Sequence, residues 1–176
     1  MLISRQTPKS EIVKLVANEC KQCGHCCMFG SGIVLSDELK PLAKAFNLSV
    51  EDFKTQFLEE FTKFNTKHYR FKQLRKGDEP HGRCIFLDVE SKQCKIHLIK
   101  PLHCRVSTCS LLGEDIQKWF DVNFFLNPRD VNSLREYKLY LEFKKPLPGA
   151  NLEDIATPEM LKKLNYEVNQ NGRREE

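Results

Sequence analysis

Cysteine is the residue whose number and spacing in this chain could do chemistry. Eight cysteines fall into two groups of four, one spaced C-x2-C-x2-C-C and one spread more widely: Cys20, Cys23, Cys26 and Cys27, then Cys84, Cys94, Cys104 and Cys109. Thiolates that converge at about 2.3 Å hold zinc, and cysteine thiolates also hold iron–sulfur clusters. A C-x2-C turn brings two sulfurs together without closing a long loop. The cysteines therefore predict a metal centre.

The two groups of cysteines should act together. The wide spacing of the second group means that only the fold can bring its thiols to one place. We expect the loop 20–27 and the segment 84–109 to meet in space, and we take all eight cysteines as candidate metal ligands. Because ligation across this separation would order the chain, the metal-free protein should be unstable.

The adjacent pair Cys26–Cys27 adds a constraint. Side chains of neighbouring residues diverge in most backbone conformations, so both thiols rarely reach one mononuclear site. One of the pair would then bind a second metal, bridge two metals or contact a polynuclear cluster. The alternative is that one of them is a buried spacer thiol, since free cysteine packs as a small apolar residue.

Composition and charge are ordinary for a globular protein. The chain has 176 residues, 40% of them hydrophobic and 30% charged, which suits one domain. The net charge of +4 arises from 28 basic and 24 acidic residues that are interspersed, so it demands neither nucleic acid nor an anionic membrane. The alternating basic and aromatic residues at 67–72 are better explained by an amphipathic strand than by nucleic-acid binding.

The expected location is the cytoplasm. The N-terminus has no apolar run typical of a secretory signal, and no stretch of eighteen apolar residues predicts a membrane span. In a reducing compartment, dense cysteine indicates metal binding or catalysis rather than disulfides. We expect a protein partner, no nucleic acid and no membrane.

Helical and strand patterns alternate along the chain. Thr7 is a plausible N-cap for a first helix, and S-V-E-D at 49–52 is a capping box that should open a longer one. The cysteine run 20–27 should be a loop because glycines lie in and after it. The predicted helices cover 7–19, 37–46, 50–64, 114–121, 132–143 and 158–168. The predicted strands cover 33–35, 67–74, and a hairpin of 84–88 with 94–96.

These elements predict an α+β fold. We expect a small single domain over 1–168, mostly helical with short strands, organised around a cysteine-lined metal centre. Its core motif region is 18–110 and its C-terminal helical part is 111–168. The polar end, 169–176, should be disordered.

Several short motifs together resemble a known family. The run 20–27 is followed by C-I-F-L-D at 84–88, C-K-I-H at 94–97 and K-P-L-H-C-R at 100–105. This combination is similar to the YkgJ-type CxxCxxCC cysteine-cluster family, which is described as a zinc- or iron-chelating domain. The resemblance covers roughly 18–110 and implies a metal site. Flagellin lysine N-methylases are longer proteins that also resemble this family in their cysteine-rich part.

The chain departs from the family pattern at two places. Lys100–Pro101 stands where the family usually has Arg-Pro, so the planar fork of a guanidinium is lost. The residues before Cys109 also differ from the family pattern. The resemblance therefore supports Cys109 as a ligand less strongly than it supports the other seven cysteines. His97 lies three residues after Cys94 and His103 directly precedes Cys104, and both are secondary candidate ligands through neutral imidazole.

Four functions follow from these observations. The favoured hypothesis is an iron–sulfur protein, in which three or four cysteines hold a 4Fe-4S cubane for electron transfer, redox sensing or cluster delivery. The alternative is a zinc-binding structural or interaction module, since eight thiolates divide into two four-cysteine sites. A metal-assisted, methylase-related protein-modifying enzyme is a third hypothesis, and thiol redox switching without metal ranks last. No P-loop, dinucleotide, hydrolase or zinc-protease motif assigns a catalytic residue.

Overall fold

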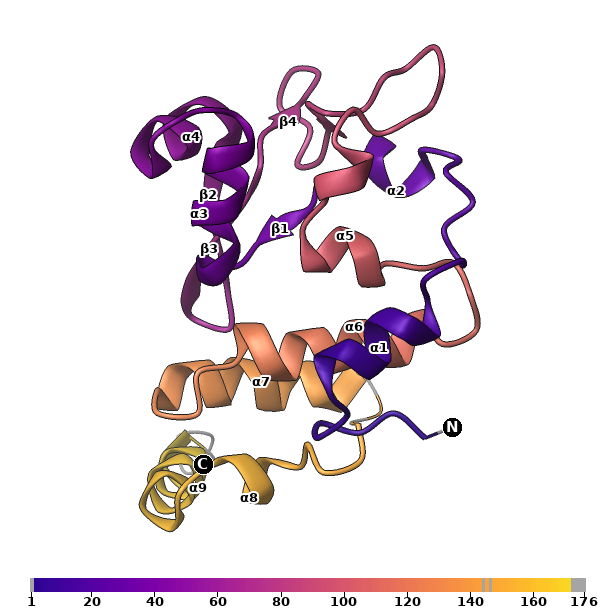
Figure 1. Cartoon of the computed structure of the whole chain (residues 1–176). Helices are drawn as coiled ribbons and strands as arrows, with labels where there is room; N and C mark the ends of the chain where they lie inside the picture. The colour runs from indigo at the N-terminus through magenta and orange to yellow at the C-terminus, as the bar shows by residue number, and fades with distance from the viewer. Residues whose placement is uncertain (1, 144, 146, 172–176) are drawn as a thin grey trace. The chain divides into compact units, whose positions relative to one another are not determined.

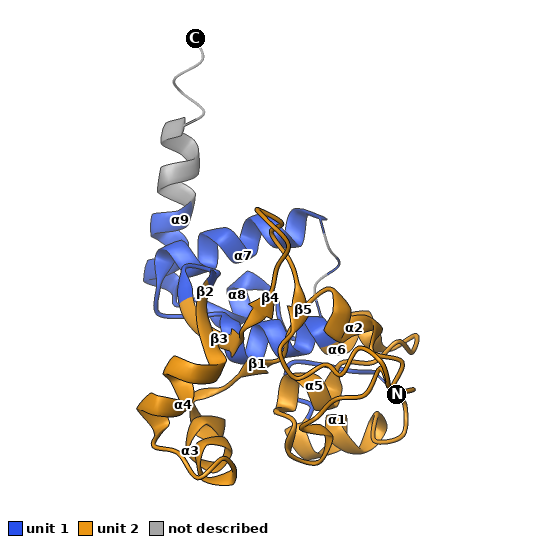
Figure 2. Cartoon of the chain, turned by 90° about the horizontal axis from the view of Figure 1, so that it is seen from above, with its two compact units in different colours: residues 1–7, 62–66, 117–176 blue, residues 8–61, 67–116 orange. Residues whose placement is uncertain are grey.

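The computed structural model describes residues 2–143, 145 and 147–171 (Figure 1). The chain divides into two compact units (Figure 2). The unit that we name the helical unit contains residues 1–7, 62–66 and 117–176. The other, the cysteine unit, contains residues 8–61 and 67–116, and all eight cysteines belong to it. The predicted single domain over 1–168 stays a prediction.

Helices dominate both units, as the sequence predicts. The α-helices are α1 (Lys9–Leu15), α2 (His25–Met28), α3 (Ser36–Ala45), α4 (Val50–Phe57), α5 (Leu102–Val106), α6 (Gly113–Phe120), α7 (Val131–Phe143), α8 (Leu152–Ile155) and α9 (Pro158–Asn171). A 3-10 turn, η1, covers His97–Ile99, and a π-helical turn, η2, covers Asp121–Phe125. No helix in the described part of the chain is long and apolar enough to cross a membrane.

The strands are short and form small sheets. They are β1 (Ile33–Val34), β2 (Leu58–Lys63), β3 (Thr66–Phe71), β4 (Gln73–Leu74) and β5 (Arg83–Cys84). One sheet has the order β1-β3-β2, and β1 runs antiparallel to β3 with Ile33 opposite Arg70. The other pairs β4 with β5, which places Gln73 opposite Cys84. The predicted α+β class is confirmed.

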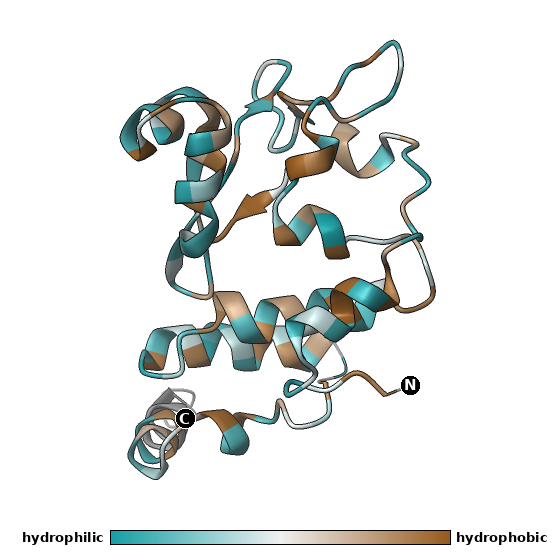
Figure 3. Ribbon diagram, viewed as in Figure 1, coloured by the Kyte–Doolittle hydropathy of each residue, from teal (hydrophilic) through white to brown (hydrophobic). Residues whose placement is uncertain are grey.

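An aromatic cluster forms the core of the cysteine unit. The Phe86 ring lies 4.9 Å from Phe71, 5.4 Å from Phe57 and 5.6 Å from Phe46, measured between centroids. Phe53 is fully buried beside them. Strand β1, a hydrophobic element in Figure 3, packs its Val34 into the same core. Because Phe86 is two residues from Cys84, this packing fixes the segment that carries the first cysteine of the second group.

The helical unit encloses a lysine. The Nζ of Lys63 lies 2.8 Å from the Oδ2 of Asp121, whose side chain is buried. The same ammonium group lies 4.9–5.8 Å from the ring centroids of Phe64, Phe125 and Tyr140. We name these five residues the Lys63 cluster. Because they come from distant parts of the sequence, their contacts join the turn at 62–66 to the helices of this unit.

The prediction of one helix over 50–64 is wrong beyond Phe57. Ser49 caps α4 as predicted, accepting a hydrogen bond from the backbone N–H of Asp52 at 3.1 Å. Leu58 then becomes extended, and β2 replaces the rest of the predicted helix. The turn at Phe64 and Asn65, both with positive φ, returns the chain into β3. Pairing with β3 satisfies the backbone of β2, and this tertiary partner overrides the helical spacing of the phenylalanines.

Three smaller expectations also change. The loop predicted over 20–27 is a loop only to Gly24, after which α2 forms. Thr7 does not cap α1, because the N-cap residue is Pro8, which makes no side-chain hydrogen bond. The Thr7 hydroxyl instead accepts a hydrogen bond from the backbone N–H of Ser4. The predicted hairpin is reduced to one bridge between Leu87 and Cys94. At the end of the chain, α9 extends to Asn171, and residues 172–176 of the predicted disordered tail lie outside the described residues.

Candidate metal centre

The two groups of cysteines meet at one pocket, as the sequence predicts. The pocket has a volume of about 150 Å³ and lies within the cysteine unit. Its lining includes His97 and His103, three lysines, and seven cysteines: Cys20, Cys23, Cys26, Cys27, Cys94, Cys104 and Cys109. The loop before α2 and α2 itself carry the lining cysteines of the first group, and the chain from the segment before α5 to the residues after it carries those of the second (Figure 1). We name this feature the cysteine pocket.

Five thiols form the inner part of the site. The thiol of Cys84 interacts electrostatically with those of Cys94 and Cys26, and the thiol of Cys104 interacts with all three. Cys27 interacts with Cys26, Cys104 and Cys84. The inner thiols are therefore two from the first sequence group and three from the second. The structure therefore combines cysteines of both sequence groups in one site.

The vicinal pair does not diverge, which corrects the expectation from sequence. The Sγ atoms of Cys26 and Cys27 lie 3.9 Å apart. Both residues belong to the single turn of α2, and this local geometry brings their sulfurs into contact. Two sulfurs bound at about 2.3 Å to one tetrahedral metal are separated by about 3.8 Å. The pair can thus serve one centre.

The ionisation of the inner thiols is coupled. A hydrogen bond from Cys27 lowers the pKa of Cys26 to about 6, and the same bond raises the pKa of Cys27. The pair therefore gives up its first proton more readily than a lone thiol and its second less readily. Burial raises the pKa of Cys104 and that of Cys84. Because nearby thiolates repel one another, a bound cation is what would allow them all to ionise.

Two glycines shape the walls around these thiols. Gly24 has φ +72, and a Cβ there would meet the carbonyl oxygen of Lys92 at 2.9 Å. The first cysteine group can therefore approach the turn at 87–92 of the second. At Gly32, a Cβ would overlap the Sγ of Cys104. The missing side chain at Gly32 leaves the space in which that sulfur sits.

Backbone amides and burial hold Cys84. The backbone N–H groups of Phe86 and Gly32 hydrogen-bond to its thiol and favour the anionic form, although burial outweighs them and raises its pKa. Cys84 is 5% exposed and packs in the aromatic core. Amide-to-sulfur hydrogen bonds of this kind orient thiolate ligands and tune the metal that they hold.

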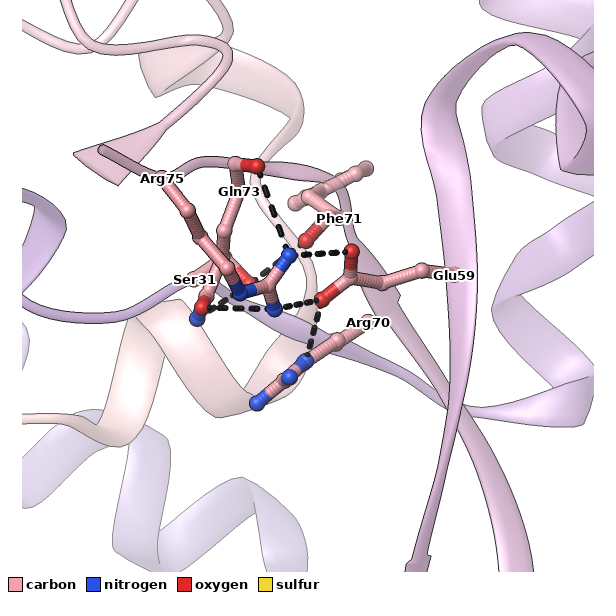
Figure 4. Close-up of polar contacts among 6 residues, drawn as sticks. All are labelled: Ser31, Glu59, Arg70, Phe71, Gln73 and Arg75. Atoms are coloured by element: carbon pink, nitrogen blue, oxygen red, sulfur yellow. Dashed lines mark hydrogen bonds and ion pairs between the residues drawn. The ribbon is translucent and has the colours of Figure 1, made fainter. Parts of the chain in front are cut away.

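A polar network supports the loop that carries Gly32 (Figure 4). The Glu59 carboxylate accepts hydrogen bonds from Arg70 and Arg75, and Arg75 also donates to the Gln73 side chain. Gln73 donates to the Ser31 hydroxyl at 3.4 Å, and that hydroxyl donates to the Phe71 carbonyl at 2.6 Å. The backbone N–H of Phe71 donates a hydrogen bond to the Gly32 carbonyl at 2.9 Å. The Arg75 and Arg70 guanidiniums hold the pKa of Glu59 below its usual range.

Glu38 positions the helix that carries Cys104. One carboxylate oxygen accepts the backbone N–H of Leu35, which starts α3, and the other accepts the backbone N–H of Leu102 at 2.6 Å. A single side chain therefore ties the start of α5 to the start of α3. Sequence reasoning missed Glu38, Gly32 and the network of Figure 4. The cap position of Glu38 is visible in the sequence, but its bond to α5 is not.

The remaining candidates lie at the edge of the site. Cys20, Cys23 and Cys109 line the pocket and are exposed. His97 and His103 line it as well, and their role as ligands stays a prediction. Cys20 and Cys23 belong to a loop in which Gln22 has positive φ. These residues are available to a molecule that approaches from solvent.

The donor set fits a thiolate-bound metal. The sulfurs are soft ligands suited to zinc or to iron–sulfur clusters, two of them lie at the separation that a shared metal requires, and Gly32 makes room for a third. Among the described residues, no three Cys, His, Asp or Glu side chains stand in an arrangement that could hold an ion. Side-chain rotation must therefore bring the thiols closer for binding.

Comparison with known proteins identifies the family. The CxxCxxCC family, described as "Putative zinc- or iron-chelating domain", matches residues 19–131. The chain belongs to this family. The match confirms the resemblance carried by the cysteine motifs, and it supports metal binding.

A curated relative covers part of the chain. The Uncharacterized protein MJ0661 of Methanocaldococcus jannaschii is 27% identical over 96 residues. That stretch is 54% of this chain and 47% of the relative, so the chain spans about half the length of the curated relative it matches. No solved structure matches this CxxCxxCC protein significantly.

Proposed function

We propose that the cysteine pocket holds an iron–sulfur cluster that serves electron transfer, redox sensing or cluster delivery. The observation that carries the proposal is the meeting of cysteines from both sequence groups. Cys26, Cys27, Cys94 and Cys104 line the pocket, and the thiol of Cys84 interacts electrostatically with them. Four cysteine thiolates are the usual ligands of a 4Fe-4S cluster, and these five thiols supply that number. A bound cluster would supply one-electron redox chemistry.

The chain's own residues have distinct parts in this proposal. Cys26 and Cys27 would bind from α2, and Cys84 would bind from β5 with its amide hydrogen bonds already in place. The ammonium group of Lys100 favours the anionic forms of Cys26 and Cys104, although burial still raises the pKa of Cys104. Leu87, which is 3% exposed, lines the pocket and excludes water from that wall.

Zinc is the second candidate. The 3.9 Å separation of the Cys26 and Cys27 sulfurs favours it as much as it favours a cluster, because both centres are bound by tetrahedrally arranged thiolates. A zinc centre would make the protein a structural or interaction module. The methylase-related enzyme remains a third hypothesis, which a methyl-donor binding measurement would test.

Anaerobic purification distinguishes these candidates. The protein should be brown, with iron and acid-labile sulfide in comparable amounts and broad visible absorption from sulfur-to-iron charge transfer. A C26S/C84S variant should lose the iron, the sulfide and the colour. As a control, S91A alters a hydroxyl that bonds to Asp88 outside the pocket and should retain all three. Colourless protein with zinc and no iron would replace the cluster by the zinc module, and protein with neither metal would reject both.

A further inference from the structure

The exposed and inner cysteines of the pocket differ in position. The inner thiols lie on α2, β5, α5 and the bridge at Cys94, which are elements packed against the aromatic core. Cys20, Cys23 and Cys109 are exposed and lie on loops that line the same pocket. We name these three residues the rim cysteines. Cys26 is exposed as well, but it belongs to α2 and its sulfur contacts that of Cys27. An incoming ligand meets the rim cysteines before it meets the buried Cys84.

The charged residues of the pocket have mainly one sign. Lys21, Lys92 and Lys100 contribute to the lining, and Glu19 is the acidic residue among the residues described as lining it. Lys21 directly follows Cys20 in the sequence. Positive charges at the mouth of a pocket attract anions and raise their rate of approach.

The geometry points to a metal-transfer site at the rim, in which Cys20, Cys23 and Cys109 exchange a metal ion between the inner thiols and an anionic small-molecule carrier. This inference rests on the proposed function, because it assumes that the inner thiols hold a metal. It assigns two tasks to the eight cysteines: the inner five retain the ion, and the rim three load and unload it. The partner class is a metal complex of carboxylate or similar anionic ligands.

The exchange is a substitution of ligands. During loading, the rim thiols would bind the ion as thiolates, releasing their protons to solvent or to the carrier, while the carrier's donors dissociate from it. The inner thiols would then take over the ion and release their own protons, and the rim sulfurs would be protonated again. No electron is transferred, and unloading follows the same steps in reverse. Both directions therefore pass through the rim.

The rate of metal release tests the inference with the metal-loaded full chain. The metal that the protein carries when purified is followed as it passes to an excess of EDTA, an anionic chelator, or to a neutral pyridyl-amine chelator. In the variant C20S/C23S/C109S, the metal content should equal that of the wild type, while release to both chelators slows by about tenfold or more. Circular dichroism checks that the variant is folded.

A second variant tests the charges. K21Q/K92Q should slow release to EDTA by about tenfold and reduce its dependence on salt, with little change in release to the neutral chelator. The matched control K40Q/K44Q removes the same charge from exposed lysines that do not line the pocket, and it should release metal like the wild type.

The outcomes separate this inference from the proposed function. A rim variant that loses its metal would show that the rim cysteines are resident ligands, which overturns the transfer role and leaves the metal centre standing. Release at the wild-type rate from the rim variant would also overturn it. An equal effect of both lysine variants would exclude an anionic carrier as the partner. A wild-type protein without metal would reject the proposed function and this inference together.

Discussion

The Lys63 cluster and the cysteine pocket gather ionisable groups in opposite ways. In the Lys63 cluster the ammonium faces a buried carboxylate at 2.8 Å, and Gln117 donates to the second oxygen of Asp121 at 2.9 Å. The ammonium group and the amide together satisfy both oxygens of the buried carboxylate. In the cysteine pocket the facing groups are alike, and each thiolate raises the pKa of its neighbours.

This difference shows in which region the chain's own groups compensate the buried charges. A buried carboxylate paired with an ammonium and an amide has its desolvation offset by groups of the same chain. Several thiolates around one pocket repel one another, and only a cation relieves that repulsion. The Lys63 cluster should therefore be insensitive to metal, and the cysteine pocket should depend on it.

Metal removal should have the largest effect and should fall on one unit. Treatment with a chelator should destabilise the cysteine unit by at least about 3 kcal/mol, since binding free energy at structural thiolate sites is also folding free energy. Hydrogen exchange measured by mass spectrometry should show faster exchange in 20–27 and 84–109. The same experiment should show little change in α7. Equal protection of the cysteine segments with and without metal would contradict the comparison.

Lys63→Met should destabilise the protein by about 3 kcal/mol, because it leaves the buried Asp121 carboxylate without its cation. Chemical denaturation measures the loss. The matched control is Lys67→Met, which breaks a pair with Glu60 between exposed side chains and should cost less than about 0.5 kcal/mol. Metal content should be unchanged in both. A loss of metal in Lys63→Met alone would show that the two regions are not independent.

Gly32→Ala should lower stability by about 1–3 kcal/mol through overpacking, and it should lower metal content as well. The reason is that its Cβ would overlap the Sγ of Cys104. Gly30→Ala is the control, because its Cβ would meet the Cys26 carbonyl oxygen at an ordinary 3.5 Å. Elemental analysis beside thermal unfolding compares the two variants. Equal metal content in both would mean that Cys104 does not need this space.

Glu59→Gln should have the smallest effect, about 1 kcal/mol at neutral pH. The arginines hold the pKa of Glu59 below its usual value, so its ionised form stabilises the fold above about pH 4.3, the ordinary glutamate pKa. This contribution disappears as the pH falls through the lowered pKa of the folded state. Denaturation from pH 7 to pH 3 should show the wild type and the variant converging in acid. A difference that does not shrink as the pH falls would exclude this electrostatic origin.

Local patterns in the sequence predicted several elements correctly. The capping box at Ser49 starts α4, the apolar pair at 33–34 forms β1, and the helical pattern at 132–143 becomes α7. These elements depend on residues close together in the chain. The helix predicted over 50–64 failed because the spacing of its phenylalanines also suits a strand, and the choice was made by pairing with β3.

The Lys63 cluster could not be predicted. Lys63 and Asp121 are 58 residues apart, and neither stands in a motif. A lysine in a sequence is most often solvated, and no local pattern says that a distant carboxylate will be buried beside it. The same is true of Gly32, whose importance depends on the position of Cys104 in space.

The sequence by itself determined the supply of thiols and the family to which the chain belongs. Eight cysteines, seven of which lie near another cysteine or in a family motif, supply soft ligands suited to zinc or iron. Only the tertiary structure decided that Cys26 and Cys27 join Cys84, Cys94 and Cys104 while Cys20, Cys23 and Cys109 remain exposed. The reason is physical: chain spacing constrains sulfurs only a few residues apart, whereas the meeting of distant thiols depends on how Phe86 and its neighbours pack.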